Sequence, residues 1–225
     1  MLIVPSLILT ADMVLRGQGA DPEKIRARRP DVLAITQQAI EIGSALLQPR
    51  LFQKRVNVVN EQGDTLLLED GDALTGPFVP DLLHGAEELF ILALTIGDEV
   101  EVESRRILAV DPPLGMALDG FGTAAAELFG RQVTNELEAL AGQKNWSIST
   151  PVSPGSITWP VDIGQPWIFK QLQPDPEVLR VTSSGQMIPA KSISMLIAAG
   201  NQLPHARSTC ESCSSRDRCL YRQHF

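Results

Sequence analysis

The chain has 225 residues, of which 44% are hydrophobic and 20% charged, and its formal net charge is −8. These values are typical of a soluble globular protein with one large domain or two small ones. The negative charge argues against a nucleic-acid groove or an anionic membrane surface as the binding partner, although it leaves room for a local basic patch.

The first ten residues are apolar but too few to span a bilayer. They lack the basic n-region and the cleavage site of a secretory signal. We interpret residues 1–10 as a strand or a docking arm. We expect a soluble cytoplasmic protein with neither nucleic-acid nor membrane partners.

Helical and extended segments are interspersed along the chain. Capping residues and apolar residues at helical spacing predict helices. Alternating apolar and polar residues, or short apolar runs between turn residues, predict strands. The predicted helices cover residues 21–29, 30–48, 77–88, 98–110, 114–140 and 163–172. The predicted strands cover residues 55–59, 66–68, 89–95, 146–149, 178–182 and 192–198, with 89–95 as the candidate buried central strand. Because this order has no strict βαβ rhythm, it favours a mixed α+β fold.

The helix predicted over residues 114–140 carries two stripes. One stripe places Gly120 and Ala124 before Glu127, with Arg131 one turn after it. Small neighbours let another backbone or a ligand approach the carboxylate, but the helix alone favours a simple Glu127–Arg131 surface pair. The other stripe is the predicted core face, which consists of Leu118, Phe121, Ala125, Leu128, Val133, Leu137 and Leu140.

Two segments rich in Pro and Gly, residues 153–160 and 181–194, flank the helix predicted at 163–172. Pro fixes φ and Gly permits close backbone approach, so such segments present backbone groups rather than long side chains. This suits a small-molecule site, but the residues alone favour a structural turn. Within these segments Trp159 is interpreted as a core anchor, and Lys191 as a solvated lysine rather than an anion contact.

Three cysteines, Cys210, Cys213 and Cys219, lie in the last sixteen residues. A Cys-x2-Cys pair places two thiolates on one turn, and a third cysteine six residues later can close around the same metal. The pattern indicates an iron–sulfur cluster or a zinc ion, with His205, His224, a carboxylate or a partner as fourth ligand. Iron–sulfur is favoured over zinc because structural zinc sites usually complete four protein ligands. Reduced surface thiols are the simpler alternative.

Taken together, several stretches resemble the S-adenosylmethionine-binding activation domain of cobalamin-dependent methionine synthase, in the form that occurs as a separate short protein. The resemblance implies one α+β domain over residues 1–205, with a bent, mainly antiparallel sheet flanked by helices, and a cysteine-containing tail over residues 206–225. The motifs that carry it are residues 94–97, 118–127, 153–155 with 159–160, and 181–184 with 187–194.

The resemblance implies an accessory factor of a corrinoid-dependent methyltransferase system. Such a factor binds S-adenosylmethionine and supports reductive methylation of an inactive cobalamin held by a partner protein, with a flavodoxin- or ferredoxin-type electron donor. The protein mainly positions the methyl donor, so no catalytic residue is assigned. The alternative is a non-catalytic docking or electron-delivery module on the same fold, with its metal or cluster in the cysteine tail.

Matched residue by residue, Glu127 corresponds to the family's helical acid that contacts S-adenosylmethionine. The ligand-binding turn corresponds to Pro154, Gly155 and Ser156. The chain also departs from the motif: Pro151 stands where the family has an arginine suited to the ligand carboxylate, and Ser156 stands where it has a tyrosine.

Overall fold

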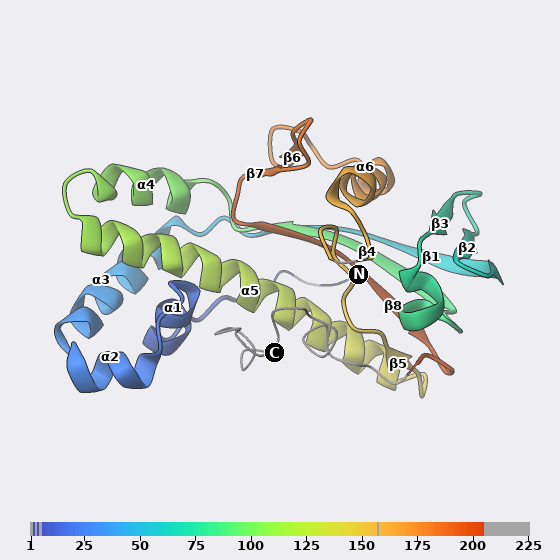
Figure 1. Cartoon of the computed structure of the whole chain (residues 1–225), viewed down its shortest axis with the longest axis horizontal. Helices are drawn as coiled ribbons and strands as arrows, with labels where there is room; N and C mark the ends of the chain where they lie inside the picture. The colour runs from blue at the N-terminus through green and yellow to red at the C-terminus, as the bar shows by residue number, and fades with distance from the viewer. Residues whose placement is uncertain (1, 3, 5, 157, 205–225) are drawn as a thin grey trace.

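The computed structural model describes residues 2, 4, 6–156 and 158–204 (Figure 1). A six-stranded sheet in the order β3-β2-β1-β4-β8-β5 forms its centre, and its neighbouring strands pair antiparallel. Its strands are β1 (Arg50–Gln62), β2 (Thr65–Leu68), β3 (Ala73–Thr75), β4 (Glu88–Thr95), β5 (Ser147–Ile148) and β8 (Ser192–Gly200). A separate ribbon pairs β6 (Arg180–Val181) with β7 (Met187–Ile188). This sheet, flanked by helices, confirms the expected antiparallel α+β fold.

Helices lie on both sides of the sheet (Figure 1). The long α5 runs along one side of the sheet with α1, α2 and α3 next to it, α4 packs on α5 beyond the end of the sheet, and α6 lies on the other side. Within the described ranges, no helix is both long and apolar enough to cross a membrane. The helices are α1 (Ala11–Gly17), α2 (Pro22–Arg28), α3 (Asp31–Leu46), the π-helical turn η1 (Val79–Leu83), α4 (Glu99–Leu108), α5 (Pro112–Gly142) and α6 (Val161–Leu172).

The central strands separate two hydrophobic cores, because successive side chains of a strand point to opposite faces. On β4, Leu92 and Leu94 join the core formed with α5, whereas Leu89 and Ile91 join the core formed with α6 and η1. The strand is therefore buried on both faces, which explains its continuous apolar run and confirms its predicted central position.

The local signals behind several helices are visible in their caps. Asp21 accepts hydrogen bonds from the backbone of Glu23 and Lys24, as predicted for the start of α2. Helix α1 was not predicted. It begins after Thr10, whose Oγ1 accepts from the Met13 backbone N–H at 3.4 Å, but seven residues are too few to establish an apolar period.

The predicted core face of α5 is correct for all but one of its residues. Leu118, Phe121, Ala125, Leu128, Val133 and Leu137 are buried. The prediction is wrong for Leu140, which is exposed because it lies at the mouth of an open cavity near the end of the helix.

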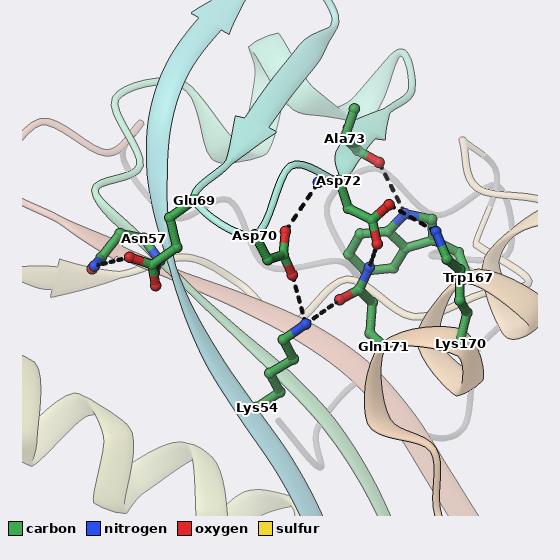
Figure 2. Close-up of polar contacts among 9 residues, drawn as sticks. All are labelled: Lys54, Asn57, Glu69, Asp70, Asp72, Ala73, Trp167, Lys170 and Gln171. Atoms are coloured by element: carbon green, nitrogen blue, oxygen red, sulfur yellow. Dashed lines mark hydrogen bonds and ion pairs between the residues drawn. The ribbon is translucent and has the colours of Figure 1, made fainter.

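Polar contacts fasten α6 to the turn between β2 and β3 (Figure 2). Lys54 donates to Asp70 and to Gln171, each at 2.6 Å. Gln171 in turn donates to Asp72, which also accepts from Lys170 at 2.7 Å. These contacts tie β1, the β2–β3 turn and α6 together, and so fix the helix that directly follows the Pro/Gly segment.

Candidate functional site

The predicted turn and helix α5 both contact β8, but on different faces of the sheet. Val152, two residues before Pro154, forms an antiparallel bridge with Leu196 and belongs to the core on the α6 side. Glu127 lies on α5 three residues before Gly130, where an added Cβ would be 3.4 Å from the side chain of Ile193, which packs with the core on the α5 side. Within the described chain, no hydrogen bond joins Glu127 to the turn.

Glu127 is a half-buried acid on the long helix. Burial raises the pKa of its carboxyl group, and the positive charge of Arg131 partly opposes this shift. Within the described part of the chain no group donates a hydrogen bond to this carboxylate. Among residues 6–156 and 158–204 it is therefore an acceptor without a donor, and a ligand with hydroxyl, amino or cationic groups can interact with it.

The small residues before Glu127 accommodate helix α1. A Cβ atom at position 17 would lie 2.3 Å from the Gly120 carbonyl oxygen and 3.1 Å from the Ala124 backbone nitrogen. The backbone of α1 therefore occupies the space that the small residues Gly120 and Ala124 leave on α5. Glu127 lies about one turn beyond this contact.

The turn after Val152 is closed by its own backbone. Gly155, at φ +92°, donates to the Trp159 carbonyl at 2.8 Å, and Ser156 donates to the Ser153 carbonyl at 3.1 Å. The N–H groups at both positions are thereby used. Among the described residues, no backbone N–H donates to the carbonyl oxygens of Pro154 and Gly155. At residues 154–156 the backbone therefore offers carbonyl acceptors rather than N–H donors.

Aromatic packing holds this turn in place. Trp159 is 2% exposed, with its ring centroid 5.2 Å from that of Phe78 and 6.4 Å from that of Trp167. Pro154 packs on α6, since an added Cβ at Gly164 would lie 2.9 Å from its ring. The predicted core role of Trp159 is confirmed. Gly155 and Ser156 remain exposed to solvent.

Lys191 contradicts the interpretation as a solvated lysine. Its side chain is only 17% exposed and contacts Thr123 Oγ1 and Asp119 Oδ1, each at 2.9 Å. The lysine side chain lies over the small Gly122, so it clamps the start of β8 onto α5. Sequence reasoning missed this contact because the partners are about seventy residues apart, beyond any local pattern. The exposed Arg131 remains as the cation beside Glu127.

The predicted metal ligands Cys210, Cys213 and Cys219 lie outside the described residues. Within the described ranges, no group of three or more His, Cys, Asp or Glu side chains could hold a metal ion.

Comparison with known proteins places the fold in a class. No family model and no curated protein sequence matches the chain. Among solved structures, however, the chain is similar in fold to one that agrees with the resemblance found in the sequence. That structure is described as the MetH reactivation domain bound to AdoHcy. It matches with a TM-score of 0.62 and 14% identity over 96% of this chain and 81% of that chain, so the match shows a shared fold.

Glu127→Gln is expected to remove one contribution that lowers stability as pH rises. Burial raises the pKa of the Glu127 carboxyl group in the folded protein, so ionisation of this group destabilises the fold. The destabilisation is absent below the pKa of the unfolded chain and reaches its full size above the pKa of the folded protein. The free energy of unfolding of the wild type, relative to the variant, should therefore fall as pH rises through this window. Urea unfolding between about pH 4 and pH 8 measures it. The exposed Glu138→Gln on the same helix is the matched control, and an identical pH profile for both variants would contradict the expectation.

Proposed function

We propose that this protein binds S-adenosylmethionine and supports reductive methylation of a cobalamin held by a corrinoid partner protein. One observation carries the proposal: the chain shares its fold with a reactivation domain whose structure contains AdoHcy. The Glu127 carboxylate and the carbonyl oxygens of the Pro154–Gly155 turn support it as hydrogen-bond acceptors. When bound, S-adenosylmethionine supplies a methyl group on a positively charged sulfonium, which the partner's corrinoid accepts after reduction by a flavodoxin- or ferredoxin-type donor.

The residues of this chain act by binding and orientation. The Glu127 carboxylate attracts the positive charge of the methyl donor and accepts hydrogen bonds from its hydroxyl groups. The carbonyl oxygens of Pro154 and Gly155 accept from an amino group, and the exposed hydroxyl of Ser156 adds a donor at the rim. Holding the donor in one orientation is the contribution that a protein makes to such a transfer.

Of the groups of S-adenosylmethionine, the carboxylate has the weakest binding partners in this chain. Pro151 has no charge, and Lys191 is already paired with Asp119. Arg131 is the cation available beside Glu127, but it is exposed and therefore well screened. We infer that Glu127 contributes a larger share of the binding free energy here than it would in a protein that also has an arginine to bind the ligand carboxylate.

Titration calorimetry of the full-length chain with S-adenosylmethionine tests the proposal. We expect saturable heat, and Glu127→Ala should weaken binding by about tenfold or more, because it removes a charge-assisted contact. Glu138→Ala, an exposed acid on the same helix, should leave affinity unchanged. Absence of saturable heat at millimolar ligand would overturn the binding proposal. Unchanged affinity in Glu127→Ala would overturn the site.

The second candidate function is a docking or electron-delivery module, and Cys210-x2-Cys213-x5-Cys219 favours it. Anaerobic purification for the same titration distinguishes the two. The second candidate is supported if the purified chain contains iron and sulfide but gives no heat with S-adenosylmethionine. A chain that contains only zinc would exclude an iron–sulfur cluster.

A further inference from the structure

A second feature of the molecule lies away from Glu127 and the turn. A cavity of about 260 Å³ opens at the C-terminal end of α5, against β1, β4 and β8. Neither Glu127 nor the Pro154–Ser156 turn lines it. Three charged side chains from three different parts of the chain converge there, namely Arg55, Glu88 and Lys144.

The charges of this cavity do not balance. The Glu88 side chain is 6% exposed, and its Oε1 accepts from Arg55 at 2.6 Å and from Lys144 at 2.7 Å. One carboxylate therefore faces two cations, which leaves a net charge of about +1 in a chain of net charge −8. The side chains of the two cations are 55% and 44% exposed, whereas the acid between them is buried, so the cations are accessible from solvent. A guanidinium has five N–H donors and an ammonium three, so donors remain for an incoming anion.

The remaining wall is apolar and aromatic. Phe90, Leu140 and Trp146 line the cavity, and the Lys144 ammonium lies 4.3 Å from the Trp146 ring centroid. Gln53 also lines the cavity, but the backbone of Leu2 uses both ends of its amide, at 2.9 and 3.1 Å. Gln143 lines the cavity as well, but the two cations supply the only positive charges among the described residues that line it.

We propose that this cavity binds a small aromatic monocarboxylate. Its carboxylate contacts Arg55 and Lys144, and its ring packs against Phe90, Leu140 and Trp146. One net positive charge matches a monoanion better than a phosphate dianion, and charge-assisted hydrogen bonds to carboxylate oxygens are among the strongest available. A volume of about 260 Å³ is below the range of about 300–1,000 Å³ typical of drug-sized ligands, which favours a single ring over a nucleotide.

Titration of the full-length chain with a charge series of one ring tests the proposal. Phenylacetate, phenylacetamide and phenethylamine share the ring but differ in charge. We expect saturable binding of phenylacetate, about tenfold weaker binding of the neutral amide and none of the amine. Tryptophan emission should change with phenylacetate, and the change should be lost in Trp146→Phe because Trp159 and Trp167 lie elsewhere. Equal affinity for phenylacetate and phenylacetamide, or no saturable signal, would overturn the proposal without any need for variants.

Charge variants locate the site. Arg55→Gln and Lys144→Gln should each weaken phenylacetate binding by about tenfold, whereas Lys144→Arg should retain it. Arg50→Gln, on the same strand but outside this cavity, is the matched control. Circular dichroism checks that each variant is folded. Wild-type affinity for phenylacetate in both Gln variants would overturn the assignment of the site to this cavity. The test does not depend on whether S-adenosylmethionine binds at Glu127.

Discussion

Trp159→Ala is expected to lower the free energy of unfolding by about 3–5 kcal/mol, a large loss for the truncation of one side chain. The side chain is almost fully buried between Phe78 and Trp167. Its removal loses the transfer free energy of an indole, leaves a cavity, and removes aromatic contacts worth about 0.5–1.5 kcal/mol per pair. The Trp159 carbonyl also accepts the Gly155 N–H, so the turn at residues 154–156 should loosen as well.

Urea unfolding followed by circular dichroism measures this loss, and Trp146→Ala is the matched control. Trp146 is only half-buried and belongs to the cavity at the C-terminal end of α5, so its truncation should cost much less. Equal destabilisation by the two substitutions would contradict the anchoring role of Trp159. A second readout is S-adenosylmethionine binding, which should weaken in Trp159→Ala but not in Trp146→Ala.

Gly17→Ala is expected to destabilise the protein by about 1–3 kcal/mol through overpacking. The added methyl would lie 2.3 Å from the Gly120 carbonyl oxygen and 3.1 Å from the Ala124 backbone nitrogen. Both are backbone atoms, which cannot rotate away as a flexible side chain does. Helix α1 must therefore move off α5, and this movement would also alter the surroundings of Glu127.

Gly142→Ala provides a closely matched control for this prediction. It is the same substitution at the last residue of a helix, but no atom from another part of the described chain lies within 4 Å of the added Cβ. Alanine is the better helix former by up to about 1 kcal/mol, so this variant should be neutral or slightly more stable. Thermal unfolding of the two variants distinguishes them. A Gly17→Ala protein as stable as Gly142→Ala would show that the α1–α5 approach is looser than described.

Much of the fold could be predicted from the sequence because its signals are local. The apolar run at residues 89–95 predicted the central strand, and the apolar period after Pro113 predicted α5. Asp21 and Pro22 predicted the start of α2. Alternation at residues 55–59, turn residues at 60–64 and the run at 66–68 predicted an antiparallel hairpin, which β1 and β2 form. The bend of the sheet and the pairing of its other strands came only from the family resemblance.

The parts that could not be predicted depend on contacts between distant segments. Lys191 reads as a solvated residue until α5 brings Asp119 and Thr123 beside it. The small residues at Gly120 and Ala124 suggested an approach to Glu127, but no pattern identified α1 as the segment that makes it. The pairing of Glu88 with two cations likewise requires β1, β4 and the end of α5 to meet.

The position of β8 has a consequence for how this chain folds. Its pairing partner β4 is synthesised about a hundred residues earlier, since Thr95 pairs with Ser192 and Glu88 with Ala199. Until β8 emerges, one edge of the most apolar strand has no neighbour, which is the kind of surface that aggregates. The late, non-local closure favours slow folding. Fragments that end before residue 192 should therefore be insoluble or bound to chaperones, whereas fragments that extend beyond residue 200 can complete the sheet.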